Sequence, residues 1–189
     1  MASIEEFLPR FQFREHHARI VAAGADAAYA QLRHVDLSES PWIGPLFALR
    51  SLPARFARRG ATPEALQPTA LGDFFGRAFT PLADSPGRCF VIGSVGRFWQ
   101  SSGGIEPVAA ASFTTNATPG CARLAWAFDF EPLGADRCRV STETRIACND
   151  AAARWRMQLY WWAIRPASGL IRREILRLLA RRCEMLRDT

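Results

Sequence analysis

The sequence predicts an α+β fold in which a curved antiparallel sheet of about six or seven strands wraps around one long C-terminal helix. Three observations support this prediction. Residues 149–187 have helical periodicity, residues 121–148 alternate as two paired strands, and residues 14–49 predict one strand followed by two short helices. The chain has 189 residues, 49% of them hydrophobic and 22% charged, which suits one buried core. We therefore expect a single domain over residues 1–189, with a leader at residues 1–13.

Residues 149–187 carry the signals of a helix. Asn149 or Asp150 can cap it, and the alanines that follow are strong helix formers. Pro166 lacks an N–H, so we expect a kink or short break near residues 163–169. An apolar stripe is expected to face the sheet, and an arginine-rich side is expected to face solvent. The stripe contains Trp155, Leu159, Trp162, Ala163, Pro166, Ile171, Ile175, Leu178, Leu179 and Leu186, and the arginines are Arg172, Arg173, Arg177, Arg181, Arg182 and Arg187.

The first half of the chain predicts one strand and two helices. Residues 14–22 alternate, and we expect His16 and Ile20 to share the face that points into the fold. Gly24 interrupts this pattern. Ser40 is a candidate N-cap for the second helix, and the proline after it suits the first helical position. The expected helices cover residues 25–36 and 41–49, and an irregular connection with one helical turn at 63–67 covers residues 51–70.

The middle of the chain predicts a meander of strands. The turn-forming residues 84–87 separate two apolar runs and indicate a hairpin. Gly93 and Gly96 interrupt the second run and indicate a bulge or a bend. The expected strands are residues 74–82, residues 88–98 and a weak strand at 108–115.

The clearest hairpin covers residues 121–130 and 137–148. In each strand every second residue is apolar or uncharged, so one face of the hairpin is expected to line the core. These faces contain Leu124, Trp126, Phe128 and Phe130 on the first strand and Cys138, Val140, Thr142, Thr144, Ile146 and Cys148 on the second.

Charge complementarity predicts how these two strands pair. In the register that we expect, Asp129 lies opposite Arg137. The same register sets Arg123 opposite Glu143, and each such pair contributes roughly 0.2–1 kcal/mol. The register two residues away would set Arg123 against Arg145, so we reject it. Glu143 and Arg145 are accordingly expected on the outer surface rather than in a catalytic role.

Composition excludes several classes of protein. The net charge is +6, and every basic side chain is arginine, because the sequence contains no lysine. The five cysteines form no CxxC spacing, which favours reduced, mostly buried thiols over disulfides or a zinc site. Neither a signal-peptide pattern nor a run of about 18 apolar residues is present, so we expect a cytoplasmic protein. The arginines of the last helix follow helical periodicity with no interleaved aromatic platform, so nucleic-acid binding is not expected.

Motifs for nucleotide binding, serine hydrolysis and zinc proteolysis are absent from the sequence. The three histidines include an adjacent pair, His16 and His17, whose side chains point to opposite faces of a strand. We therefore expect no cofactor and no bound metal. The ingredients of acid–base catalysis exist in His16, Asp129, Glu143 and Tyr160, but no spacing in the sequence brings them together.

The element order and three local patterns carry a resemblance to a known superfamily. The patterns are IGSVGRFW (92–99), VSTETRI (140–146) and YWWAIRPASGLIRRE (160–174). Over about residues 14–187 the chain resembles bacterial members of the helix-grip superfamily, which includes START-like lipid-transfer domains, pollen-allergen-like proteins and polyketide cyclase/dehydrase proteins of the SRPBCC type. This resemblance implies a deep cavity between the sheet and the last helix that holds an apolar or amphipathic small molecule.

The same region is the best pocket candidate from the residues themselves, because apolar gaps with a few polar groups are typical ligand sites. For Trp126 and Phe128 core packing is the favoured interpretation, and His16 is expected to be a hydrogen-bonded core histidine rather than a base, whereas for Thr142 and Thr144 the two interpretations stay even. The cavity candidates are His16, Ile20, Phe79, Trp99, Trp126, Phe128, Thr142, Thr144, Leu159, Tyr160 and Trp162.

Two functional hypotheses follow. The first is binding or transport of a hydrophobic small molecule or lipid, with transient contact between the basic protein and an anionic membrane surface. The second is a cyclase- or dehydratase-like enzyme that acts on an enclosed polyketide-like or aromatic substrate. In that enzyme His16, Thr142 or Tyr160 would donate or accept protons.

Overall fold

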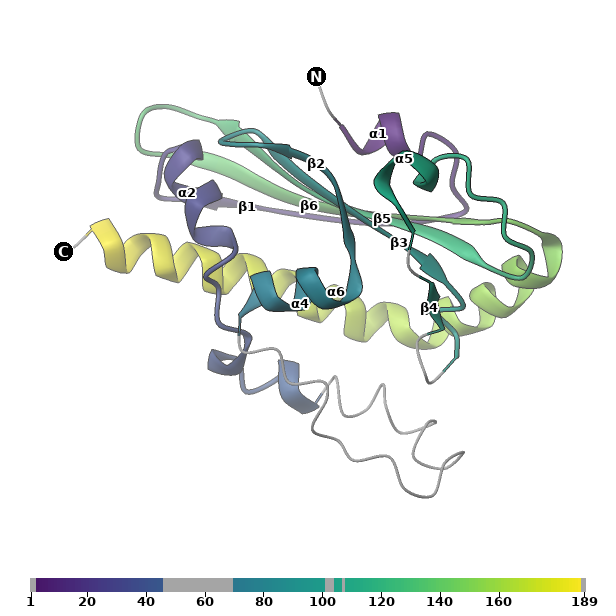
Figure 1. The fold of residues 1–189 in the computed structure, drawn as a ribbon. Helices are drawn as coiled ribbons and strands as arrows, with labels where there is room; N and C mark the ends of the chain where they lie inside the picture. Colours follow the sequence, from purple (N-terminus) through teal and green to yellow (C-terminus); the bar gives the residue numbers. More distant parts are fainter. Residues whose placement is uncertain (1–2, 46–69, 101–103, 107, 188–189) are drawn as a thin grey trace.

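The computed structural model describes residues 3–45, 70–100, 104–106 and 108–187, and in it an antiparallel sheet curves around one long helix (Figure 1). The first elements are helix α1 (Ile4–Phe7), strand β1 (Phe13–Val21), helix α2 (Ala25–Leu32) and the short 3-10 helix η1 (Leu37–Glu39). The later elements are α4 (Leu71–Ala78), β2 (Thr80–Ser85), β3 (Cys89–Gly96), β4 (Ile105–Glu106), α5 (Ala110–Phe113), β5 (Ala122–Pro132), β6 (Cys138–Cys148) and α6 (Ala151–Arg187).

The sheet has the strand order β1-β6-β5-β3-β2, and β4 pairs with β3 beside this path. All pairings are antiparallel, and the long strands β5 and β6 form the centre. Helix α6 lies against β1 and β6, and α2 packs on its C-terminal half. A sheet that grips its own last helix is the helix-grip arrangement, so the fold class that the sequence predicted is confirmed.

Helix α6 is one unbroken helix. The Asp150 side chain caps it, because Oδ1 accepts a hydrogen bond from the Ala153 N–H at 2.7 Å and the other carboxylate oxygen accepts one from Gly120. We expected a kink or a short break near residues 163–169; no break occurs, and Figure 1 shows a continuous helix that is bowed with its concave side toward the sheet. Pro166 has no N–H to donate to the Trp162 carbonyl. Both residues are exposed, so water can hydrogen-bond to that carbonyl instead.

The buried face of the first half of α6 differs from the prediction. Trp155, Leu159 and Trp162 are exposed, and Met157 and Trp161 point to the sheet instead. Both faces carry bulky apolar residues at helical spacing, so periodicity alone could not choose between them. The choice is made by packing against the β1 end of the sheet, where Phe13 and Trp161 lie with their ring centroids 5.7 Å apart.

In the second half of α6 the predicted stripe is largely confirmed. Ile175, Leu178 and Leu179 are buried, whereas Leu186 is exposed. Arg172, which we placed on the solvent side, is buried in the interior. It occupies the same side of the helix as Ile175 and Leu179, at steps of three and four residues.

The two faces of β1 are also reversed relative to the prediction. Glu15 lies opposite Thr144 of β6, and both side chains point toward α6. His16 lies opposite Glu143, on the outer face of the sheet, and His16 and Ile20 are exposed. Alternation correctly predicts which residues share a face, but the assignment of that face to the core was wrong.

The β5–β6 register is shifted by four residues from the predicted one. Asp129 lies opposite Ser141, and Arg123 lies opposite Ala147. A shift by an even number keeps the same side chains on the inner face, so the core faces are unchanged. The observed register pairs all eleven residues of each strand. The backbone hydrogen bonds and side-chain contacts of this complete pairing outweigh two exposed charge pairs, which contribute roughly 0.2–1 kcal/mol each. One exposed ion pair does form, between Glu131 and Arg139 at 2.7 Å.

Glu143 and Arg145 lie on the outer face of the sheet as expected, but they are buried rather than at the surface. The N-terminal leader covers them, since Arg145 donates to the Leu8 carbonyl at 3.3 Å and its guanidinium lies 4.7 Å from the centre of the Phe11 ring. Arg14 and Arg145 both donate to the Glu143 carboxylate, at 2.8–2.9 Å and 2.6 Å. Burial raises the pKa of Glu143, but these two guanidinium partners outweigh burial and hold it below its ordinary value.

Several element boundaries differ from the prediction. Residues 71–78 form helix α4 rather than the start of a strand, and residues 110–113 form helix α5 rather than a weak strand. The hairpin of β2 and β3 is confirmed, with a register shift at Pro81 and not at the glycines. Ser40 caps the next helix as predicted, because its hydroxyl accepts hydrogen bonds from the Trp42 and Ile43 N–H groups at 3.3 Å. The rest of that helix and the connection expected at 51–70 lie outside the described residues, apart from residue 70.

The five cysteines are free thiols, four of them buried and Cys148 partly buried. Burial raises the pKa of Cys148 and of Cys183 to about 11. Among the helices of the described residues, none is both long and apolar enough to cross a membrane.

Candidate functional site

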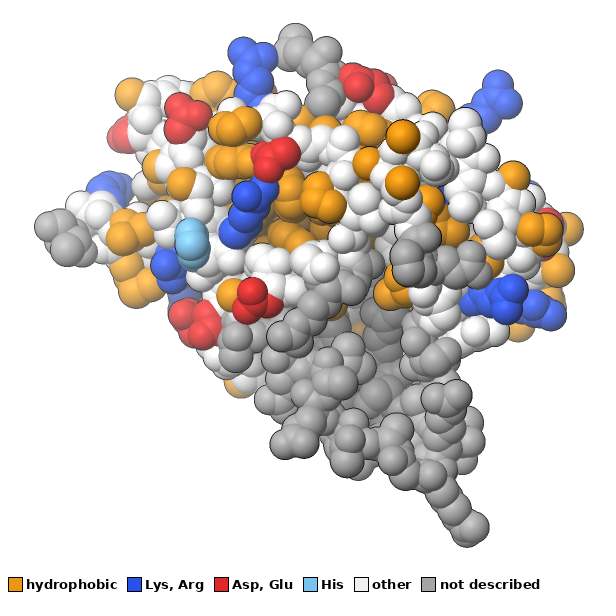
Figure 2. Space-filling model, viewed as in Figure 1, with side chains coloured by type: hydrophobic (Ala, Val, Ile, Leu, Met, Phe, Trp, Pro, Cys, Tyr) orange, Lys and Arg blue, Asp and Glu red, His pale blue; other side chains and the backbone are white. Residues whose placement is uncertain are grey.

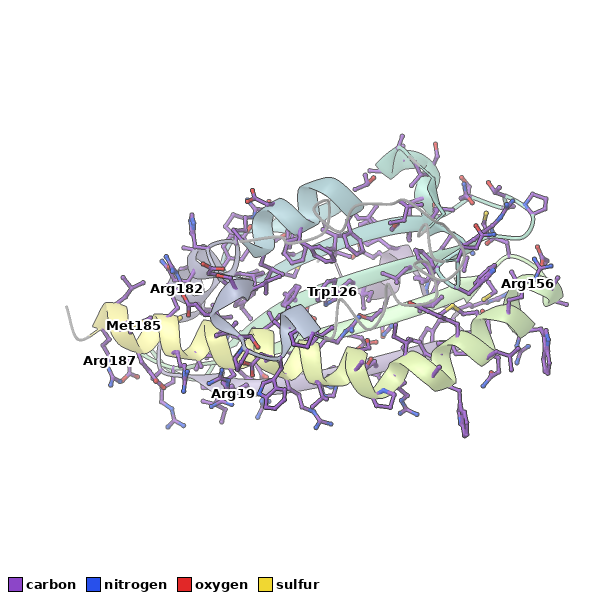
Figure 3. The ribbon with its side chains drawn as sticks, turned by 90° about the horizontal axis from the view of Figure 1, so that it is seen from below. Arg19, Trp126, Arg156, Arg182, Met185 and Arg187 are labelled. Carbon is purple, nitrogen blue, oxygen red and sulfur yellow. The ribbon has the colours of Figure 1, made fainter. Side chains whose placement is uncertain are left out.

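An aromatic wall lines the inner face of the sheet. Strand β5 places Trp126 and Phe128 on this face with their ring centroids 5.2 Å apart. Helix α4 and the residue after it bring three more rings, so that the centroids of Phe75, Phe79 and Phe74 lie 5.5, 5.9 and 6.5 Å from that of Trp126. Phe74 and Phe79 are only partly buried, and Figure 2 shows hydrophobic side chains in a hollow on the face that carries α2 and α4. Figure 3 shows Trp126 near the middle of the sheet, on the side of α6.

Thr142 of β6 serves this wall as a hydrogen-bond partner. The Trp126 indole Nε1–H donates to Thr142 Oγ1 at 2.6 Å, and the threonine is fully buried. An indole N–H without an acceptor would be costly at this depth. The hydroxyl of Thr142 therefore fixes the orientation of the indole ring.

Arg172 places a positive charge against the aromatic wall. Its side chain comes from α6, is 8% exposed, and lies with Cζ 4.9 Å from the centre of the Trp126 ring. Nε and Nη2 donate to Thr144 Oγ1 at 3.0 and 2.7 Å. Nη1 donates to the Ser168 carbonyl at 3.2 Å and to the Ser168 hydroxyl. The guanidinium is thus held between the helix and the sheet by the Thr144 and Ser168 oxygens and the Trp126 ring, and the Glu15 carboxylate forms an ion pair with it at 3.8 Å.

Glu15 and His17 of β1 adjoin this cation. The Glu15 side chain is 7% exposed, and its Oε2 lies 3.8 Å from Arg172 Nη1 but accepts no hydrogen bond from the described residues. Its Oε1 lies 3.1 Å from His17 Nε2. Arg173 Nε points at His17 Nδ1 from 3.5 Å, which fits the neutral tautomer with its proton on Nε2. Gly169 leaves room for the carboxylate, because a Cβ there would lie 2.6 Å from Glu15 Oε1.

A cavity of about 630 Å³ opens beside this cluster, at the edge where β1 meets α6. A second cavity of about 290 Å³ lies between α2 and the C-terminal end of α6. Trp126 lines neither of these two cavities. The first is lined by Arg14, Glu15, His16, His17, Arg165, Pro166, Gly169, Leu170 and Arg173.

The structure brings together about half of the predicted site residues. Trp126, Phe128, Thr142, Thr144 and Phe79 form the inner wall. Trp99 and Tyr160 are partly buried and pack on a separate cluster around Phe13 and Trp161. The predicted residues that the structure places elsewhere, exposed and off the inner wall, are His16, Ile20, Leu159 and Trp162.

Sequence reasoning missed Glu15, His17 and Arg172. A signal existed for Arg172, whose helical spacing to Ile175 and Leu179 places it on the buried stripe. The roles of Glu15 and His17 can be recognised only once it is known which face of β1 points toward α6. Within the described part of the chain, no three His, Cys, Asp or Glu side chains gather as metal ligands.

Comparison with known proteins gives similar folds at low sequence identity. No family model and no curated protein matches the chain. One similar structure is the di-domain aromatase/cyclase BexL of the BE-7585A biosynthetic pathway, which is 15% identical to this chain with a TM-score of 0.41. The match covers 94% of this chain and 48% of BexL, so this chain spans about half the length of BexL. Norcoclaurine synthase of Thalictrum flavum is 13% identical over 87% of this chain and 94% of its own, with a TM-score of 0.35. The Zhui aromatase/cyclase of Streptomyces sp. R1128 is 12% identical over 91% and 93%, with a TM-score of 0.32.

The strand order and the gripped helix define the chain as an α+β protein of the helix-grip fold. Its interior carries a buried arginine on the aromatic wall, held by Thr144 and adjoining Glu15.

Proposed function

We propose that the protein binds a hydrophobic small molecule that carries an anionic end, in the space between the sheet and α6. The observation that carries the proposal is the buried guanidinium of Arg172 on the ring of Trp126. Aromatic and apolar surface with a few convergent polar groups is the usual composition of a small-molecule site.

The chemistry of Arg172 selects the polar end of the ligand. A buried guanidinium is costly to desolvate, and its planar set of donors matches a carboxylate, sulfonate or phosphate. The Thr144 hydroxyl and the Trp126 ring orient these donors, and Glu15 Oε2, 3.8 Å from Nη1, accepts no hydrogen bond from the described residues, so an anionic ligand can compete with it for the guanidinium. The apolar part of the ligand would lie on the rings of Phe74 and Phe79, which are only partly buried.

The edge cavity supplies an approach to this site. Its wall includes Glu15, whose carboxylate adjoins Arg172. The opposite wall is formed by α6 around Pro166 and Leu170. Arg172 itself does not line this cavity, so a ligand that enters between β1 and α6 would pass the Glu15 carboxylate before it reaches the Arg172 cation and the aromatic wall.

A second candidate function is a proton-transfer enzyme of the same fold, such as a cyclase or dehydratase. The observation that favours it is the His17–Glu15 pair on the wall of the open cavity. A neutral imidazole that donates to a carboxylate is the arrangement of a general base, and its other nitrogen, Nδ1, accepts a hydrogen bond from Arg173 Nε at 3.5 Å that a substrate proton would have to displace. His17 takes the role that the sequence had suggested for His16, which lies on the outer face.

A pair of fluorescent probes tests the binding proposal. Anilinonaphthalene sulfonate has an aromatic body and an anionic group, and phenylnaphthylamine has the same body without the anion. Substitution of Arg172 by Met should lower the affinity for the sulfonate about tenfold and leave that for phenylnaphthylamine nearly unchanged, because one charge-assisted contact is lost. The exposed Arg181→Met is the matched control and should bind both probes like the wild type.

Thr144 provides a second pair of variants in case Arg172→Met does not fold. Thr144→Val removes the hydroxyl that positions the guanidinium and should weaken only sulfonate binding, whereas Thr144→Ser keeps the hydroxyl and should bind normally. Equal loss of both probes, or no loss of either, would contradict the assignment of Arg172 to the ligand. Native mass spectrometry of the purified protein, followed by organic extraction, would then identify the class of any retained compound.

A further inference from the structure

The first half of α6 presents an apolar face to solvent. We call it the Trp155 face, and in it Trp155 is 65% exposed, Leu159 57%, Trp162 84% and Leu170 53%, with Pro166 also exposed. The opposite side of the helix is already packed, since Met157 and Trp161 are buried against the sheet. Contiguous exposed apolar surface of this kind marks an interaction site more often than scattered single residues do.

The geometry of the helix makes this face continuous. At about 100° of rotation per residue, its five side chains lie within about 80° of one another around the helix axis. The spacing of Trp155, Leu159 and Trp162 is four and then three residues. The face therefore runs as one stripe along the helix rather than winding around it.

Arginines border the stripe on both sides. Arg156 lies about 100° from Trp155 in one direction, and Arg154 and Arg165 lie about 80–100° away in the other. The segment 151–173 contains no Asp or Glu. The three arginines are exposed, so this half of α6 presents a tryptophan-rich stripe between two cationic borders. Figure 3 shows Arg156 at the N-terminal part of α6, away from the end that carries Arg182 and Arg187.

The geometry points to an anionic lipid bilayer as the partner of the Trp155 face. Indole rings partition to the interface between lipid headgroups and acyl chains, and arginines beside them reach the lipid phosphates. Helix α6 would lie parallel to the bilayer with its buried side still on the sheet. The edge cavity between β1 and α6 shares Arg165, Pro166 and Leu170 with this helix segment, so docking would bring its mouth close to the lipid.

The charge pattern argues against a second copy of the chain on this face. A symmetric dimer would place the same stripe on both partners, so arginine borders would meet arginine borders with no acidic residue between 151 and 173 to pair with them. A bilayer that contains anionic lipids supplies the missing negative charge over the whole length of the stripe.

Vesicle flotation with the full chain tests the inference. The probes are vesicles of phosphatidylcholine alone and of phosphatidylcholine mixed with phosphatidylglycerol, each at low and at high salt. We expect the wild type to float with the mixed vesicles at low salt and to be released by high salt. Substitution of Trp155 and Trp162 by Ser should lower the partition coefficient at least about tenfold, because two indoles leave the interface.

Two further variants separate the contributions. Arg154→Gln with Arg156→Gln should lower binding to the mixed vesicles by roughly fivefold for each arginine and reduce its dependence on salt. Trp42→Ser removes an equally exposed indole outside α6 and should bind like the wild type. All substituted side chains are exposed, so the variants should keep the thermal unfolding curve of the wild type.

Three results would overturn the inference. The first is a wild type that does not float with the mixed vesicles at low salt. The second is a Trp155/Trp162 variant that binds as well as the wild type. The third is a wild-type dimer in sedimentation velocity that the same variant dissociates, since the face would then belong to a second copy of the chain. Binding of the naphthalene probes is independent of all three outcomes, so this inference and the proposed function can fail separately.

Discussion

The guanidinium of Arg172 lies over the indole ring of Trp126, with Cζ 4.9 Å from the ring centroid. The two residues come from α6 and β5, and Thr144 of β6 accepts two hydrogen bonds from the same guanidinium. The contact therefore joins the gripping helix to the two central strands. A cation–π contact removed from water contributes about 2 kcal/mol, so this pair stabilises the fold as well as shaping the site.

Thr142 should contribute to stability through its hydroxyl. Thr142→Val keeps the shape of the side chain but leaves the buried Trp126 Nε1–H without its acceptor, which costs about 1–3 kcal/mol. Urea unfolding followed by tryptophan fluorescence measures the change in the free energy of unfolding. Thr142→Ser keeps the hydroxyl and loses one methyl group, so it should be the less damaging substitution. The reverse order of stability would show that the indole N–H has another acceptor.

Two helical glycines should respond in opposite directions to alanine. Gly76 of α4 has open space where a Cβ would stand, so Gly76→Ala should stabilise the protein by about 0.5–1 kcal/mol through helix propensity. At Gly169 the new Cβ would lie 2.6 Å from Glu15 Oε1 and 3.4 Å from His17 Nε2. Displacing that buried carboxylate should cancel the gain and lower the melting temperature. A more stable Gly169→Ala protein would show that Glu15 is not confined by α6.

Glu143 should set part of the acid stability. Its folded-state pKa is depressed, so its contribution is present above the unfolded-state value of about 4.3 and is lost as the pH falls through the folded-state value. Glu143→Gln should destabilise the protein by about 3 kcal/mol at neutral pH, because Arg145 stays buried with a weaker partner. The difference from the wild type should shrink as the pH falls from about 5. Unfolding measured across pH gives both curves.

The exposed Glu131–Arg139 pair supplies the control for this measurement. Both side chains are about half exposed, at 59% and 48%, so Glu131→Gln should change the free energy of unfolding by less than about 1 kcal/mol. If Glu143→Gln lowered the free energy of unfolding by as little as Glu131→Gln, the Arg14–Glu143–Arg145 cluster would not be the buried network that the contacts indicate.

Cys148 and Cys183 should be slow to react in the folded state. With pKa values of about 11 they are almost fully protonated at about pH 8, and the thiolate is the reactive form. Alkylation by iodoacetamide, followed by mass spectrometry of peptides, should be roughly a hundredfold slower in buffer than in urea. Equal rates in the two solutions would mean that these thiols are accessible and ionised in the native protein.

The sequence allowed the fold class, the last helix and the inner faces of β5 and β6 to be predicted. Each depends on a periodic pattern long enough to be unambiguous, such as the alternation that puts Trp126 and Thr142 on the core side. The short elements α4 and α5 were missed because a few apolar residues in a row are compatible with either a strand or a helix. At residues 110–113 the alanines favour a helix, but a segment of four residues is too short for that propensity to decide.

Periodicity identifies which side chains share a face, and this is a property of the chain itself. Which of two apolar faces is buried is a property of what packs against it. Trp161 and Trp162 are neighbours on α6, yet one contacts Phe13 and the other is 84% exposed, because the curvature of the sheet and the position of β1 choose between them. For the same reason the buried roles of Glu15 and Arg172, which define the candidate site, exist only once α6 lies across β1 and β6.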